Sequence, residues 1–186
     1  MAKVMVWNLV TLDGNFEGEQ KWDLDFHGRA WGPDLEKLSS DFGNDTGLLV
    51  FGRVTYEGMK AYWTTAEGET EVKGYMNALP KLVASRTISA SDWSNTDVTS
   101  DIIGEIRKRK ENLDKPIRIF GSAELVDTLL DAGLVDEIML AIVPVRLGKG
   151  TRLFKDGARF DLDLIEARPL ENGTILVRYA PNAKSA

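Results

Sequence analysis

Short apolar runs and amphipathic stretches alternate along most of the chain. Five runs are rich in Val, Ile and Leu, a composition typical of strands buried on both faces of a sheet. These runs cover residues 4–10, 47–51, 81–84, 117–120 and 138–143. Between them the pattern predicts four helices, over 33–42, from near Arg53 to Tyr62, from an N-cap at Ser100, and from Gly121 to a terminating Gly133. This order predicts an α/β fold with a largely parallel sheet.

The C-terminal segment follows a different pattern. Apolar and acidic residues alternate over 160–164, Asn172-Gly173 is a turn signal, and 174–179 has the composition of a strand. The pattern predicts a terminal antiparallel hairpin. No internal repeat, low-complexity segment or flexible linker divides the sequence, so residues 1–186 are expected to form a single domain.

The amino-acid composition excludes several classes of partner and catalytic site. The 186 residues include 23 Lys and Arg against 29 Asp and Glu, and this net charge of −6 argues against nucleic acid as a partner. The absence of cysteine excludes disulfides, thiolate metal sites and cysteine nucleophiles. A single histidine, His27, cannot form a two-histidine metal site, and no metal is expected.

The apolar run at residues 4–10 is interrupted by Asn8 and followed at once by Asp13-Gly14. It is too short to span a membrane and has no signal-peptide cleavage pattern after it. We therefore expect a cytoplasmic protein without membrane contacts.

Three of the predicted strands end in groups suited to phosphates. The segments are Gly52, Arg53 and Thr55; Ser85, Arg86 and Thr87; and Gly121 with Ser122. In open α/β sheets, anions bind at the carboxyl ends of strands, where helix N-termini offer free N–H groups. Each segment alone also fits ordinary structure: a strand-to-helix turn with a surface arginine at 52–55, common loop composition at 85–87, and an N-cap at Ser122. The Rossmann and P-loop glycine motifs are absent.

In order and spacing, these segments resemble the dihydrofolate reductase-like superfamily, and more specifically the reductase domain of the bifunctional riboflavin-biosynthesis deaminase-reductase. The resemblance runs from Val4 to about Tyr179 and includes residues 11–14 and the block 133–154. It implies a mixed, mostly parallel sheet flanked by helices, with a C-terminal antiparallel hairpin. It also implies an NADPH-dependent oxidoreductase.

The resemblance assigns the cofactor contacts residue by residue. It implies that Gly52, Arg53 and Thr55 contact phosphates of NADPH, and that Ser85 and Arg86 lie near the adenosine 2′-phosphate. The pyrophosphate would be wrapped by Gly121, Ser122, Ala123, Glu124 and Leu125. Two arginines in this pattern favour NADPH over NADH, because a 2′-phosphate is best bound by a bidentate cation. Many relatives carry a second glycine where Ser122 stands, so the cofactor's approach there is expected to differ.

The segment 13–32 is a long, aromatic connection of the kind that is usually functional. Its Trp22, Phe26 and Trp31 either stack on a planar substrate or anchor the segment to the core. His27 in the same segment is either a proton donor or an ordinary surface residue.

Three acids are candidates for the catalytic group. Asp13 belongs to an Asp-Gly turn, and the resemblance also places it beside the substrate. Asp34 and Glu36 open the first predicted helix, where acids are favoured by the helix dipole and where dihydrofolate reductases carry their pterin-binding acid. The sequence does not choose between these interpretations.

The sequence leads to a reductase that transfers hydride to a C=N or C=O bond of a small heterocyclic or ribosylamino-pyrimidine-like molecule. Riboflavin reductases commonly carry a basic residue after the Asp-Gly pair, whereas this chain has Asn15. A dihydrofolate reductase proper is one alternative. Another is a nucleotide-binding or ligand-sensing homodimer without turnover. The block 134–154 is assigned to the fold and to a subunit interface, so a homodimer is expected.

Overall fold

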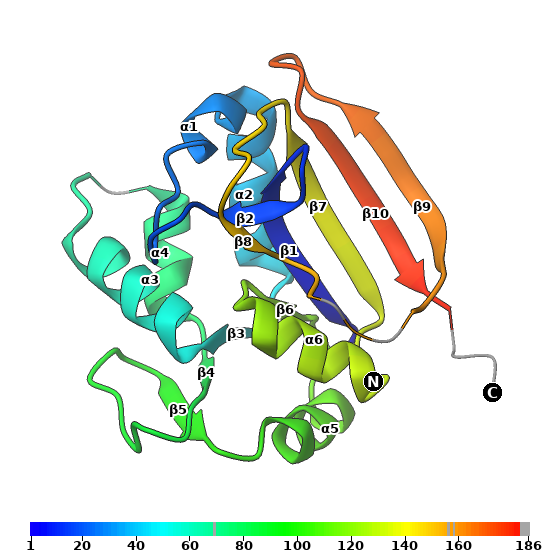
Figure 1. The fold of residues 1–186 in the computed structure, drawn as a ribbon. Coiled ribbons are helices and arrows are strands. Elements are labelled where there is room, and N and C mark those ends of the chain that lie inside the picture. The colour runs from blue at the N-terminus through cyan, green and yellow to red at the C-terminus, as the bar shows by residue number, and fades with distance from the viewer. Residues whose placement is uncertain (69, 156, 158, 183–186) are drawn as a thin grey trace.

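An eight-stranded sheet organises the computed structural model, which describes residues 1–68, 70–155, 157 and 159–182. The strands are β1 (Val4–Thr11), β3 (Leu48–Gly52), β4 (Lys81–Ala84), β5 (Thr96–Thr99), β6 (Ile117–Ile119), β7 (Glu137–Val143), β9 (Leu162–Pro169) and β10 (Ile175–Pro181). Their order across the sheet is β5-β4-β3-β6-β1-β7-β10-β9 (Figure 1). All pairs from β5 to β7 are parallel, and β10 is antiparallel to both neighbours. The predicted fold class is confirmed.

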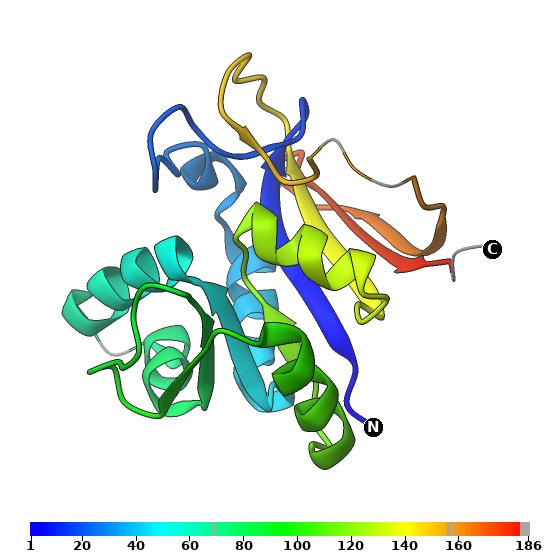
Figure 2. The ribbon, with the colours of Figure 1, turned by 60° about the horizontal axis from the view of Figure 1, so that its bottom comes forward.

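Helices cover both faces of the parallel part of the sheet. They are α1 (His27–Ala30), α2 (Pro33–Asp45), α3 (Arg53–Thr65), α4 (Glu71–Ala78), α5 (Ile102–Asn112) and α6 (Ala123–Asp131). Successive residues of β1 enter different cores: Val6 packs with residues of α5 and α6, whereas Trp7 packs with Phe42 of α2. Figure 2 shows α5 and α6 on one face of the sheet and α2 on the other. Because both faces are buried, apolar and polar residues do not alternate along the strand.

The five apolar runs correspond to β1, β3, β4, β6 and β7, with ends shifted by at most one residue. The predicted N-cap at Ser100 is wrong. Asp101 caps α5, because its Oδ1 accepts a hydrogen bond from the Gly104 N–H at 2.9 Å. The sequence pattern also gave no sign of α4, the polar edge strand β5, or the small sheet formed by β2 (Asn15–Glu17) and β8 (Thr151–Arg152).

The predicted C-terminal hairpin is present as β9 and β10. Strand β10 pairs with β7 and so joins the hairpin to the main sheet. The apolar residues that alternate with acids in β9 do not mark a buried face, since Leu162 and Leu164 are 37% and 59% exposed. Strand β9 is an exposed edge.

None of the helices in the described ranges has the length and apolar character that a membrane crossing requires.

Candidate functional site

Three strand-end segments meet at the carboxyl edge of the sheet: the strand-to-helix junctions after β3 and β6, and the loop that joins β4 to β5. They follow β3, β4 and β6, which are consecutive in the sheet order. Together they line a cleft of about 370 Å³, here called the strand-end cleft. Predicted cofactor residues that line it are Gly52, Arg53, Ser85, Arg86, Ser122, Glu124 and Leu125. Segments separated by up to 70 residues in the sequence are thereby brought into one polar site.

Helix N-termini open into the strand-end cleft. Helix α3 begins directly after Gly52 and α6 directly after Ser122, and neither N-cap residue makes a side-chain capping bond. The first-turn N–H groups of both helices are therefore free to bind an anion. Ser122 occupies the N-cap position that the sequence suggested, but its hydroxyl does not cap the helix.

The two predicted arginines differ in their surroundings. The Nη1 atom of Arg53 lies 2.8 and 3.0 Å from the two carboxylate oxygens of Glu57, one turn along α3. Arg86 is exposed and makes no ion pair with any residue that the structure describes. Beside it, the Ser85 hydroxyl accepts hydrogen bonds from the N–H groups of Thr87 and Ile88, which fixes the turn. Arg86 is the cation available to a ligand.

Gly52 brings two of the junctions into contact. A Cβ atom at this position would lie 2.5 Å from Ser122 Oγ and 3.1 Å from Ser122 N. The Gly52 N–H also donates to the Gly121 carbonyl at 3.0 Å. Any side chain at residue 52 would push the β3 and β6 junctions apart, and both supply N–H groups to the cleft.

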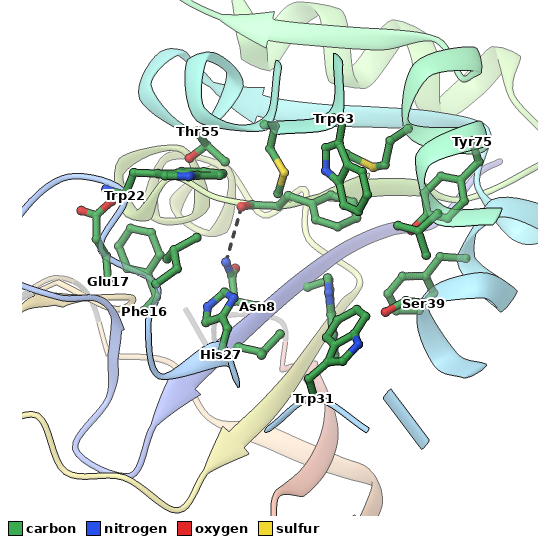
Figure 3. Close-up of a pocket in the computed structure, with 18 residues that line it drawn as sticks. Asn8, Phe16, Glu17, Trp22, His27, Trp31, Ser39, Thr55, Trp63 and Tyr75 are labelled. Carbon is green, nitrogen blue, oxygen red and sulfur yellow. Dashed lines mark hydrogen bonds between the residues drawn. The ribbon is translucent and has the colours of Figure 1, made fainter. Parts of the chain in front are cut away.

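A second cavity, of about 160 Å³, lies beside the strand-end cleft and is lined mainly by aromatic side chains (Figure 3). We call it the aromatic cavity. Its walls come from β1, the segment 16–31, and helices α2, α3 and α4. The aromatic residues that line it are Trp7, Phe16, Trp22, His27, Trp31, Phe42, Trp63, Tyr75 and Phe120. Four of the five tryptophans of the chain therefore surround one cavity.

Gly121 lies where the two cavities meet. A Cβ atom there would lie 3.5 Å from Asn8 Nδ2 and 3.6 Å from Thr55 Oγ1, and both of these residues line the aromatic cavity. Its neighbour Ser122, joined to it by a cis peptide bond, lines the strand-end cleft. Gly121 has a φ of +97°, a conformation that favours glycine. Thr55 thus faces the aromatic cavity, although it was predicted to contact phosphate.

Ala123 is the remaining residue that was predicted to contact the cofactor. It is buried in the first turn of α6.

Three polar atoms of the aromatic cavity's lining residues are buried without a hydrogen-bond partner. They are Asn8 Oδ1, His27 Nε2 and Trp63 Nε1. An unpaired buried polar atom costs about 1–3 kcal/mol, so a cluster of them is typical of a ligand site. Burial lowers the pKa of His27 to about 4, which leaves the imidazole neutral at pH 7.

Asp13 connects the turn after β1 to the loop after β7 through hydrogen bonds. Its carboxylate accepts hydrogen bonds from Thr11 Oγ1 at 2.6 Å and from the N–H groups of Leu147 and Gly148 at 3.2 and 2.7 Å. These bonds, with that from Thr11 the strongest, hold the pKa of Asp13 well below its usual range. The carboxylate is therefore ionised at neutral pH, and this favours the turn-stabilising interpretation over a role as proton donor.

The acids of α2 also lie away from the aromatic cavity. Asp34 accepts a hydrogen bond from the Glu171 N–H at 3.3 Å, and Glu36 accepts one from Trp31 Nε1 at 3.1 Å. Neither residue is among those that line the cavity.

The carboxylate that does line the aromatic cavity belongs to Glu17 of β2. Its Oε2 accepts a hydrogen bond from the Trp22 N–H at 2.7 Å, and its Oε1 accepts one from Thr151 Oγ1 at 3.3 Å. Neither Glu17 nor Asn8 was predicted from the sequence as a site residue. For Asn8 a signal existed, because an amide in the middle of a fully buried strand needs a partner.

The aromatic residues Trp22, Phe26 and Trp31, predicted to contact the substrate or to anchor the segment, have two different environments. Trp22 and Trp31 line the aromatic cavity, whereas Phe26 is only 7% exposed and packs in the core with Trp7 and Leu35. Trp22 has a φ of +65°, a strained conformation for a bulky residue. Its hydrogen bond to Glu17 helps to hold that conformation. Phe26 is thus an anchor for the segment, and Trp22 and Trp31 are positioned to contact a ligand.

Comparisons with known proteins agree with this architecture. Residues 2–176 match the model of the RibD C-terminal domain. The uncharacterized protein YyaP of Bacillus subtilis (strain 168) is 32% identical over 177 residues, which cover 91% of this chain and 90% of YyaP.

Two solved structures share the fold. A putative riboflavin biosynthesis protein from Shewanella sp. PV-4 aligns with a TM-score of 0.78 at 17% identity, covering 98% of this chain and 100% of that one. Dihydrofolate reductase from Enterococcus faecalis, complexed with NADP(H), aligns with a TM-score of 0.64 at 13% identity over 97% of each chain. The superfamily resemblance found in the sequence is confirmed, and the chain belongs to the RibD C-terminal domain family.

Proposed function

We propose that this protein is an NADPH-dependent reductase that acts on a C=N or C=O bond of a small planar molecule. The observation that carries the proposal is the meeting of two chemically different cavities at Gly121. One offers cations and helix N-termini, and the other offers aromatic walls. A dinucleotide whose phosphates lie in the first can extend its nicotinamide ring to the edge of the second, which leaves the cavity itself to the substrate. Membership of the RibD C-terminal domain family supports this interpretation.

The residues of the strand-end cleft fit such a cofactor. Two uncapped helix N-termini offer N–H groups to the pyrophosphate, and Arg53 adds a cation at the start of α3. Arg86 and the Ser85 turn would hold the 2′-phosphate, because a forked guanidinium binds phosphate oxygens in pairs. When bound, the cofactor supplies a hydride from C4 of its nicotinamide.

The chain itself binds, orients and shields the substrate. The aromatic walls exclude water, and the unpaired atoms of Asn8, His27 and Trp63 fix the orientation of a ring. Reduction also needs one proton on the substrate nitrogen or oxygen. That proton comes from water or from Glu17, the carboxylic acid that lines the cavity among the described residues. His27 is neutral at pH 7 and does not donate as an imidazolium.

The direct test is a titration of the protein with NADPH, followed by nicotinamide fluorescence, and then a measurement of NADPH oxidation in the presence of candidate substrates. We expect saturable binding of NADPH and substrate-dependent oxidation. Failure to bind at millimolar NADPH would contradict the proposal.

A ligand-sensing protein without turnover is the second candidate. It is favoured by the positions of Asp13, Asp34 and Glu36, none of which lines the aromatic cavity. This candidate predicts that NADPH binds normally and that no carbonyl, dihydrofolate or ribosylamino-pyrimidine substrate accelerates its oxidation.

A further inference from the structure

We propose that the aromatic cavity takes an uncharged, unphosphorylated planar heterocycle that presents both N–H and C=O groups at its edge. The inference rests on the proposed function in so far as this heterocycle is called a substrate. The binding preference itself is a property of the cavity alone.

The first observation is the charge of the walls. No lysine or arginine of the described residues lines the aromatic cavity. Its ionisable lining residues are Glu17, His27 and Tyr75. Burial lowers the pKa of His27 to about 4, and burial likewise raises the pKa of Tyr75 to about 12. At neutral pH neither ring carries a charge, so neither can pair with an anion.

A phosphate monoester carries close to two negative charges at pH 7. Moving an unpaired charge out of water costs several kcal/mol even after the surroundings relax. The aromatic cavity offers no cation to offset this cost, and the carboxyl group of Glu17 belongs to the same walls. A phosphate bonded close to the ring would therefore oppose binding instead of anchoring it.

The cations near the cavity are already engaged. The guanidinium of Arg118 stacks 3.7 Å from the centre of the Phe42 ring. It is buried, it is bonded to Asp45 and Thr46, and it does not line the cavity, although its Nη1 has no partner. Arg29, between His27 and Trp31, donates to the Asn172 carbonyl at 2.8 Å. Arg53 and Arg86 line the strand-end cleft, where the proposed cofactor has its own phosphates.

The second observation is the set of unpaired polar atoms. Trp63 Nε1 is a donor and Asn8 Oδ1 an acceptor, and His27 Nε2 takes either role according to its tautomer. A hydrocarbon ring would leave all three unpaired. A heterocycle with adjacent N–H and C=O groups presents partners for both the donor and the acceptor.

Size sets a third limit. The cavity volume of about 160 Å³ is close to that of the engineered lysozyme cavity of about 150 Å³ that binds benzene. The cavity therefore has room for about one aromatic ring, and a fused second ring would extend beyond it.

The test compares two ligands that differ only in phosphate: 6-hydroxymethylpterin and its phosphate monoester. Tryptophan fluorescence reports binding, because four of the five tryptophans line the cavity. A Trp93→Phe background removes the fifth, which is buried and does not line the cavity. We expect the unphosphorylated pterin to bind at least about tenfold more tightly. Equal or tighter binding of the phosphate ester, or no binding of either ligand, would overturn the proposal.

Two variants separate charge from shape. Met59→Lys adds a cation to the wall of the cavity with little change in length, and Met59→Leu is the matched uncharged control. We expect the lysine variant to reverse the preference and the leucine variant to keep it. An unchanged preference in Met59→Lys would show that charge does not exclude phosphate, and would contradict the proposal.

A third variant tests the polar edge. Trp63→Phe keeps an aromatic ring and removes the Nε1 donor, and we expect it to weaken pterin binding by about fivefold. Unchanged affinity would contradict the role of this donor. NADPH titrations of the same proteins report on the strand-end cleft alone. Loss of NADPH binding with an intact pterin preference would refute the reductase and leave the assignment of the cavity unaffected. Normal NADPH binding without a preference for the unphosphorylated pterin would refute the assignment of the cavity and leave the reductase unaffected.

Discussion

The strand-end cleft and the aromatic cavity touch at Gly121, yet they are built in different ways. The cleft is made from short contiguous segments at the ends of adjacent parallel strands, and two helices with uncapped N-termini begin at its walls. The cavity is made from single side chains contributed by β1, a long connection and three helices. The cleft depends on backbone geometry, whereas the cavity depends on packing.

This difference predicts different responses to mutation. A change of backbone shape in the cleft should affect every ligand that carries a phosphate. A change of one side chain in the cavity should affect recognition of the ring and leave cofactor binding intact.

Gly52→Ala should have the largest effect. The new Cβ would lie 2.5 Å from Ser122 Oγ and 3.1 Å from Ser122 N, so the hydroxyl must rotate away and the β3 and β6 junctions must shift by a few tenths of an ångström. We expect NADPH and NADH binding to weaken by about 100-fold, and the free energy of unfolding to fall by about 1–3 kcal/mol. Isothermal titration and urea unfolding measure the two effects.

Gly74→Ala is the matched control for that substitution. Its Cβ would meet nothing within 4 Å in the middle of α4, so helix propensity should make this variant slightly more stable. Adding Ser122→Gly to Gly52→Ala removes the nearest contact and should restore part of the affinity. If Gly52→Ala binds both cofactors normally, the close contact of the two junctions is not what shapes the cleft.

Arg86→Ala should have a smaller and more selective effect. The exposed guanidinium has no ion-pair partner among the residues described, so its removal costs only the contact with ligand. We expect NADPH binding to weaken by about 30-fold and NADH binding to change little, because a charge-assisted hydrogen bond contributes about 1.5–3 kcal/mol. Arg107→Ala, an exposed arginine of α5 outside the cleft, is the control. Equal losses for both cofactors would refute the assignment of Arg86 to the 2′-phosphate.

The same contrast explains what the sequence could predict. Gly52, Arg53, Ser85 and Arg86 were identifiable because parallel strands place their carboxyl ends at one edge, so linear order translates into proximity. The residues that line the aromatic cavity could not be predicted from strand order in this way. Glu17 reaches it only because β2 pairs with β8, a two-strand sheet too short to leave a pattern.

The errors in predicting the edge strand β5 and the N-cap of α5 also have local causes. The polar strand β5 lies at the edge of the sheet, where no apolar run is required. Asp101 and Ser100 are both good N-cap residues, and only the geometry shows which one reaches the Gly104 N–H.

The neutral state of the buried His27 ring can be tested through the pH dependence of stability. Because burial lowers its folded-state pKa to about 4 from 6.5, the unfolded chain binds a proton first as the pH falls. Stability should therefore decrease between pH 6.5 and pH 4, and this contribution should be constant outside that window. In His27→Phe the decrease over the same window should be smaller, as measured by urea unfolding at several pH values. Identical pH profiles for both proteins would mean that His27 is not held neutral by burial.

Asp13→Asn should produce the smallest effect and separates a structural carboxylate from a catalytic one. The hydrogen bonds that lower the pKa of Asp13 stabilise the fold above its unfolded value of 3.8, and this contribution is lost as the pH falls through the folded pKa. At neutral pH the neutral amide introduced by Asp13→Asn accepts the N–H groups of Leu147 and Gly148 less strongly than the carboxylate does, so hydrogen exchange of these two should accelerate. Turnover should change little, because Asp13 does not line the aromatic cavity. A large loss of turnover with unchanged hydrogen exchange would instead place this carboxylate at the substrate. The site would then consist of three parts: the cleft built from backbone, the cavity built from side chains, and a catalytic carboxylate that follows β1.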